Sequence, residues 1–164
     1  MSERDDVVTR MVGPLPPAVA AAVDGRANIF AMTEAAHDAA LTPNDPGGLS
    51  HALRAALAER VSRLHADDKM AGHFRGLLDV AGADETLLAI ASLEGDTPDP
   101  VVAAMVGYTD QVAKAPREMT AADITALQSA GVSDPDIVRL AELNAFLAYQ
   151  LRLIAGLRLL GANA

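Results

Sequence analysis

Four histidines are the side chains of this sequence best suited to acid–base chemistry, because imidazole titrates near neutral pH. His65 and His73 would lie about 12 Å apart along a continuous helix, so they could share a metal ion only if the chain turned sharply between them. His37 and His51 lack the spacing of metal ligands, and both are predicted to be solvated. The sequence therefore predicts no metal site and no cofactor.

Thiol chemistry is excluded, since the sequence contains no cysteine. This composition fits a reducing compartment, and the charged residues 1–6 do not resemble a targeting signal, so a cytoplasmic location is expected. Asp67 and Asp68 could act as a general base or bind a cation. Two acids at a helix start also favour the helix dipole, and we expect them to cap a helix instead.

Composition and charge limit the fold and the partners. The 164 residues suit a single domain over residues 1–164, and 51% hydrophobic but only 3% aromatic residues indicate a core of small aliphatic side chains. No segment shows the alternation of a strand, so an all-α fold is predicted. A net charge of −9 opposes binding to nucleic acid or an anionic membrane. Charges interrupt the apolar stretch 137–160, which predicts a soluble helix and no membrane span.

The first half of the chain is predicted to consist of helices separated by one loop. Residues 1–15 are expected to form a less ordered arm, and Ala-rich helices should follow on either side of Gly25. Prolines and glycines in 42–48 indicate the loop. Ser50 should cap a helix with one apolar stripe, and a break near 65–68 leads into a second helix. The stripe consists of Leu53, Leu57, Val61 and Leu64, and the second helix contains Met70, Phe74, Leu77 and Leu78.

Capping signals mark the helices of the second half. A short helix is expected after Asp84, and a longer one should begin with Thr97 as its N-cap. Thr120 and Ser133 each precede an aspartate by three residues, a variant of the capping box, so two further helices are predicted. The last one, over about 134–160, would be about 40 Å long.

The last helix has more apolar surface than a chain of this size readily covers, which favours a homo-oligomer: a dimer, a trimer or a hexamer. Several polar side chains lie on otherwise apolar helices and are expected to hydrogen-bond across helices or between subunits. They are Tyr108, Asn144, Tyr149, Gln150 and Arg152.

Two segments, residues 45–78 and 119–138, resemble the alkylhydroperoxidase D and carboxymuconolactone decarboxylase superfamily. The first is similar to the family's core helical hairpin, in which a helix with a Leu-x-Val-Ser-x-Leu pattern leads into Cys-x-x-Cys-x-x-His-His. The second, with the long helix after it, resembles the family's later hairpin. The resemblance implies an all-α, usually oligomeric fold, and the Asp-Pro-Gly-Gly-Leu-Ser start at Asp45 is similar to a subgroup of uncharacterised members.

The resemblance also indicates which family residues are missing. The two redox thiols of active members correspond to Asp67 and Met70, the relay histidine to Phe74 and the relay glutamate to Ala55. None of these side chains can perform the thiol reaction. Met70 and Phe74 could line a pocket, but their spacing is that of ordinary core, which is the interpretation we favour. His73, beside the lost relay position, is the remaining candidate proton-transfer residue.

The resemblance implies a protein that has lost the thiol peroxidase centre and serves as a non-redox binding or structural partner, with a pocket for a small apolar ligand. A cysteine-containing homologue of the family is a candidate partner. The alternative is a cofactor-independent lyase or isomerase resembling carboxymuconolactone decarboxylase. In that enzyme His73 would be the general acid or base, and Arg63, His65 and Arg75 would contact the substrate.

Overall fold

The computed structural model describes residues 5–95 and 97–163, and within these ranges it contains helices and no strand, as the all-α prediction requires. The helices are, in chain order, α1 (Val7–Val12), α2 (Pro17–Asp24), α3 (Ala27–Leu41), α4 (His51–Leu64), α5 (Asp68–Ala81), α6 (Glu85–Ser92), α7 (Pro100–Lys114), the short 3-10 helix η1 (Pro116–Glu118), α8 (Ala121–Ser129) and α9 (Asp134–Ala162).

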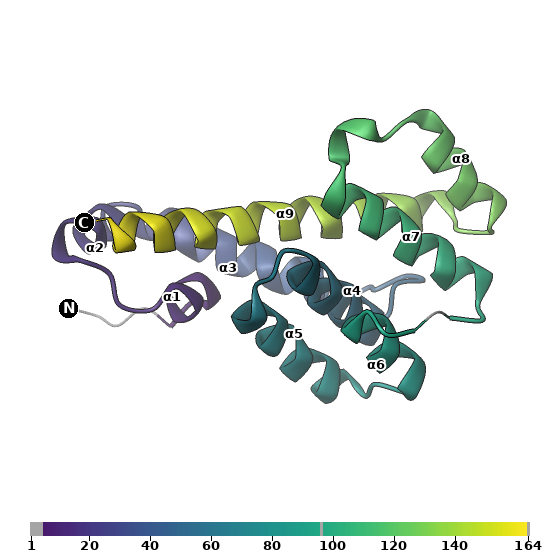
Figure 1. Cartoon of the computed structure of the whole chain (residues 1–164), viewed down its shortest axis with the longest axis horizontal. Coiled ribbons are helices and arrows are strands. Elements are labelled where there is room, and N and C mark those ends of the chain that lie inside the picture. The colour runs from purple at the N-terminus through teal and green to yellow at the C-terminus, as the bar shows by residue number, and fades with distance from the viewer. Residues whose placement is uncertain (1–4, 96, 164) are drawn as a thin grey trace.

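Helix α9 runs along the length of the molecule, and α3 lies beside it (Figure 1). The C-terminal end of α9 lies near α1 and α2, and its N-terminal end near α7 and α8 (Figure 1). The helical hairpin α4–α5 packs together with α6 between these two ends. The expected hairpin and the expected long final helix are therefore both present.

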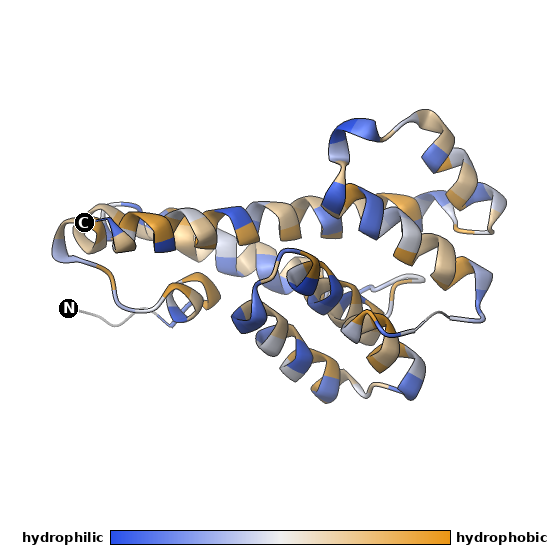
Figure 2. Cartoon of the chain, viewed as in Figure 1, coloured by the Kyte–Doolittle hydropathy of each residue, from blue (hydrophilic) through white to orange (hydrophobic). Residues whose placement is uncertain are grey.

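The core joins this hairpin to α9. Leu57 of α4, Met70 and Phe74 of α5, and Leu143 and Leu147 of α9 have no exposed surface and belong to one hydrophobic cluster. Hydrophobic and hydrophilic residues alternate along the α9 ribbon (Figure 2). By length and hydropathy alone α9 would be long and apolar enough to cross a membrane, a property that the core helices of soluble proteins share.

The start of the chain differs from the less ordered arm expected for residues 1–15. Within the described part of this segment, Val7–Val12 form α1, and Val7 and Val8 are almost fully buried. Asp6 caps the helix by accepting the N–H of Thr9, and Glu34 of α3 accepts the N–H of Val7. The Asp6 cap is a local contact, but the contact with Glu34 comes from a helix distant in sequence, which local composition does not indicate.

Most helix starts lie where the capping signals placed them, because a capping hydrogen bond involves only neighbouring residues. The confirmed N-caps are Ser50, Asp67, Asp84, Thr120, with Asp123 completing its capping box, and Ser133. The start predicted at Thr97 is wrong. Helix α7 has Asp99 as its N-cap, with Pro100 at the first helical position and the Asp99 carboxylate accepting the N–H groups of Val101 and Val102.

This correction can be tested by comparing two alanine variants. Asp99→Ala should lower the free energy of unfolding by about 1 kcal/mol, the usual value of a side-chain N-cap. Thr97→Ala should change it by less than about 0.5 kcal/mol, because Thr97 lies outside the helix and accepts one hydrogen bond, from the N–H of Asp99. Guanidinium chloride unfolding followed by circular dichroism measures both. Equal losses would restore Thr97 as the cap.

Candidate functional site

Two histidines meet where α3 and α5 approach each other. The Nε2 atoms of His37 and His73 are 3.3 Å apart, and the ring centroids are 5.1 Å apart. His37 is only 4% exposed, so the prediction that it is solvated is wrong. Its Nδ1 atom is within hydrogen-bonding distance of the side-chain amide of Gln150 on α9, at 3.3 Å from Oε1 and 3.2 Å from Nε2. Helices α3, α5 and α9 therefore hold this histidine pair together.

Aromatic rings surround the pair. Phe74, next to His73 on α5, stacks on the His37 ring with the centroids 5.9 Å apart, and Phe146 of α9 meets His37 edge-on. The hydroxyl of Tyr149 on α9 is 2.9 Å from that of Thr33 on α3. Apolar surroundings of this kind exclude water from one side of the imidazoles.

This environment favours neutral imidazoles. Burial lowers the pKa of His73 to about 4, and the neighbouring His37 and Arg10 act in the same direction. Burial also lowers the pKa of His37, although its hydrogen bond to Gln150 and the charges of Glu34 and Asp38 oppose the change. Both rings are therefore uncharged at neutral pH, with a ring nitrogen lone pair available on each.

Three of the expected interhelical hydrogen bonds include residues of α9. Gln150 reaches His37 on α3, Tyr149 reaches Thr33 on α3, and Asn144 donates to Thr109 of α7 at 3.2 Å. Arg152 is exposed and its guanidinium donates to Ala148 of its own helix, so for this residue a contact between subunits stays a prediction.

The residues that the sequence resemblance aligns with a redox centre have structural contacts here. Asp67 caps α5 by accepting the N–H of Met70 at 3.1 Å, and its other carboxylate oxygen accepts from Arg158 at 2.7 Å. Met70 and Phe74 have no exposed surface and Ala55 is 2% exposed. The capping interpretation of Asp67 and the core interpretation of Met70 and Phe74 are confirmed.

The two arginines expected to hold a substrate carboxylate both contact Glu59 of α4. Arg75 donates two hydrogen bonds to this carboxylate, at 2.7 and 2.9 Å, and Arg63 forms an ion pair with it at 2.8 Å. The hydrogen bonds to Glu59 raise the pKa of Arg75. Glu59 is fully buried, although it lies outside the apolar stripe of α4. His65 is exposed at the C-terminal cap of α4.

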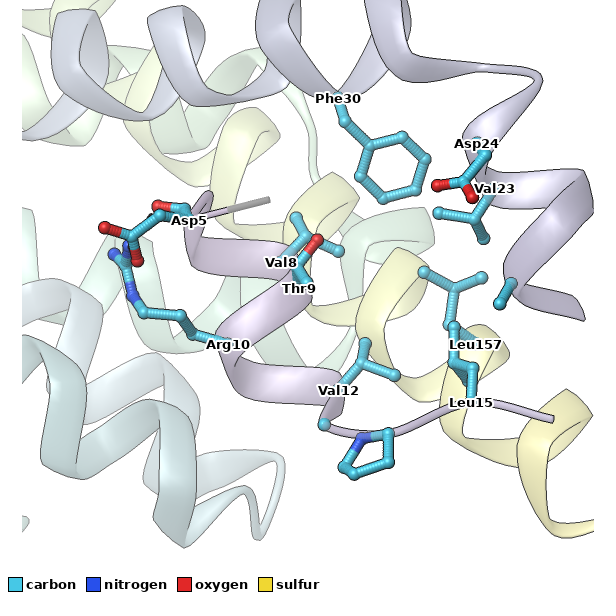
Figure 3. Close-up of a pocket in the computed structure, with 13 residues that line it drawn as sticks. Asp5, Val8, Thr9, Arg10, Val12, Leu15, Val23, Asp24, Phe30 and Leu157 are labelled. Carbon is cyan, nitrogen blue, oxygen red and sulfur yellow. Dashed lines mark hydrogen bonds and ion pairs between the residues drawn. The ribbon is translucent and has the colours of Figure 1, made fainter. Parts of the chain in front are cut away.

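A pocket lies outside this region, between α1, α2, the start of α3 and the end of α9. Its volume is about 750 Å³. Its rim includes Asp5, Thr9 and Arg10, and Arg10 forms an ion pair with Asp5. Figure 3 shows side chains from these helices converging on it. The apolar ones include Val8, Val12, Leu15, Ala20, Val23, Phe30 and Leu157, and the carboxylate of Asp24 also lines the pocket.

A smaller pocket of about 190 Å³ lies beside the hairpin. Ala55 lines it together with His51 and Leu77. His73 and Arg75 line neither of the two pockets. The region of Met70 and Phe74 is packed core, as favoured from the sequence, and the larger of the two pockets lies mainly between α1, α2 and α3, outside the segments that carry the resemblance, with Leu157 of α9 as a further lining residue.

The described residues define an all-α protein in which a helical hairpin packs on a long final helix. Comparisons with protein-family models, with curated proteins and with solved structures found no match to this chain.

Proposed function

We propose that this chain is a thiol-free member of the alkylhydroperoxidase D-like superfamily that binds a small apolar ligand and has no redox chemistry of its own. The pocket between α1, α2, α3 and α9 is the observation that carries the binding function. The membership rests on the sequence resemblance of the α4–α5 hairpin and of the segment that enters α9.

The size and the lining of this pocket suit such a ligand. Ligand pockets usually measure about 300–1,000 Å³ and have mainly apolar walls with a few polar groups. Here the walls come from Val8, Phe30 and Leu157, which belong to α1, α3 and α9. The guanidinium of Arg10 at the rim is engaged by Asp5, so it is not a free cation for an anionic ligand. A largely apolar small molecule is the ligand class that fits best.

The loss of redox chemistry follows from the residues at the hairpin. A carboxylate that caps a helix and a buried thioether occupy the positions that correspond to the family's thiols. The lyase alternative is less well supported, because Arg63 and Arg75 are bound to Glu59 and are not directed at an open cavity beside His73. Exposed apolar side chains on α9, among them Val138, Leu159 and Leu160, support the expected homo-oligomer.

Filling the pocket should abolish ligand binding. Ala20 of α2 lines the pocket, and Ala20→Trp would place an indole inside it. We expect the wild-type chain to bind the neutral apolar dye Nile red with increased fluorescence, and Ala20→Trp to bind it at least tenfold more weakly. Titration of the dye, with circular dichroism to confirm an unchanged helix content, makes the measurement.

Ala22→Trp is the matched control, because Ala22 is exposed on the same helix and does not line the pocket. This variant should bind Nile red as the wild type does. Equal affinity of Ala20→Trp and the wild type would place the ligand elsewhere and disprove the pocket assignment. Separately, peroxide reduction driven by dithiothreitol in the chelator-treated protein would contradict the absence of redox chemistry.

A further inference from the structure

The histidine pair has a geometry that fits either a long hydrogen bond or two ligands of one metal ion. The Nε2 atoms of His37 and His73 face each other at 3.3 Å, with the ring planes inclined by 45°. Hydrogen bonds from N–H donors are usually about 2.7–3.2 Å long, so a hydrogen bond at this separation would be long, as is the contact of His37 with Gln150 Oε1. Two neutral imidazoles that approach through the same ring atom also have a second use in proteins, the binding of a metal ion.

The separation matches that of two ligands of one tetrahedral metal ion. Zinc binds imidazole nitrogen at about 2.0–2.1 Å, and a tetrahedral angle then places two such nitrogens about 3.3–3.4 Å apart. If the one metal ion lay on the axis of both imidazole rings, the ring centroids would be about 5.2 Å apart. The observed separation is 5.1 Å. The inclination of the planes is compatible, since each ring can rotate about its metal–nitrogen bond.

Metal-bound histidines usually make a hydrogen bond through their second ring nitrogen, and Gln150 is placed to make such a bond to His37. The fully buried side chain of Gln150 is within hydrogen-bonding distance of His37 Nδ1. With Oε1 as the acceptor, this contact fixes the proton on Nδ1 and leaves the lone pair on Nε2, which is the atom directed at His73. Metal binding through Nε2 requires this orientation of the amide, because the reverse orientation, with Gln150 Nε2 donating to Nδ1, would place the proton on Nε2.

Charges near the pair come from three helices. Glu34 and Asp38 of α3 act on His37 with negative charge, and Arg10 of α1 acts on both rings with positive charge. The ammonium group of Lys69 on α5 donates hydrogen bonds to the carbonyl oxygens of Arg10 and Met11. The local field is therefore mixed, and two neutral imidazoles remain the strongest ligands for a cation at this point.

We infer that His37 and His73 together bind a divalent transition-metal ion of the zinc class through their Nε2 atoms. No group of three histidine, cysteine or acidic side chains among the described residues could hold a metal, so water completes the coordination. His73 is only partly buried, which leaves a path for the ion from solvent. This inference goes beyond the proposed ligand pocket, which lies elsewhere in the fold and does not include either histidine.

Titration of the chelator-treated chain with Zn²⁺ tests the site. Isothermal titration calorimetry should give one Zn²⁺ per chain, and long-range ¹H–¹⁵N spectra should show that the Nε2 resonances of both His37 and His73 shift. His73→Gln should weaken Zn²⁺ binding at least tenfold, since one of only two protein ligands is lost. His65→Gln is the matched control, because His65 is exposed, and it should leave the affinity within twofold.

Several results would overturn the site. Shifts confined to His51 and His65, or a Zn²⁺ affinity in His73→Gln within twofold of the wild type, would show that the ion binds elsewhere or only weakly to surface histidines. The absence of any Zn²⁺ binding would leave the pair as a packing contact. His37→Gln provides a second test if it folds. If His37→Gln does not fold, the result for His73→Gln is decisive, because His73 is partly exposed. Circular dichroism should confirm that His73→Gln is folded.

Discussion

Arg54→Met is expected to lower the free energy of unfolding by about 3 kcal/mol or more, because it leaves three carbonyl oxygens without their donor, each of which costs about 1–3 kcal/mol when buried. Arg54 is 3% exposed on α4, and its guanidinium donates to the carbonyls of Leu49, Ala40 and Pro46 at 2.9–3.2 Å. Burial lowers the pKa of this guanidinium, which nevertheless keeps its proton.

These contacts explain why the effect should be so large. The three carbonyls belong to the end of α3 and to the loop before α4, so one side chain fastens the connection between these helices. The same loop is held to α9 by Asp136, which accepts the N–H of Gly48, and by the ion pair of Arg139 with Asp45. Methionine keeps an unbranched apolar stem like that of arginine but is shorter and donates no hydrogen bond.

Guanidinium chloride unfolding measures this loss, with Arg152→Met as the control. Arg152 is exposed on α9 and donates only to a carbonyl of its own helix, so its replacement should change the free energy of unfolding by less than about 0.5 kcal/mol. Similar values for the two variants would mean that water or a local rearrangement satisfies the three carbonyls when Arg54 is absent.

Phe74→Ala should destabilise the chain by about 3–5 kcal/mol, the usual cost of removing a fully buried phenylalanine ring. Phe74 has no exposed surface, packs in the main core and stacks on His37. The loss combines the transfer free energy of the ring with the cavity that rigid neighbouring helices cannot close. Unfolding by denaturant, followed by circular dichroism, gives the value.

Val80→Ala is the control on the same helix, because Val80 is 89% exposed and its truncation should cost less than about 0.5 kcal/mol. Phe74→Leu should be intermediate, since a branched aliphatic side chain fills part of the space. A loss below about 1 kcal/mol for Phe74→Ala would contradict the placement of this ring in the core.

The local features of the fold were predictable from sequence. Ser50, Asp67 and Ser133 lie at helix starts because a cap is a contact between a side chain and an N–H three residues later. The one capping error, Thr97 in place of Asp99, arose because two consecutive Thr/Asp-Pro pairs carry the same signal. The helix at Val7–Val12 was missed, since its stability comes from burial against distant helices.

The candidate site was predictable only in part. His73 was singled out, but His37 was taken for a solvated side chain, because nothing near it in sequence indicates that α5 and α9 cover it. A buried partner for Arg75 was likewise not expected, and Glu59, 16 residues earlier, provides it. The one available signal for His37 was its position on the same helix face as Phe30 and Leu41, both of which are buried.

The sequence by itself determined the helical class, most helix starts and the absence of thiol chemistry, since each depends on residue type or on contacts within a few residues. The tertiary structure alone decided that His37 meets His73, that Glu59 holds two arginines and that the large pocket forms beside α9. The physical reason is that these arrangements depend on how helices cross. Those crossings follow from the packing of many side chains distributed over the whole chain.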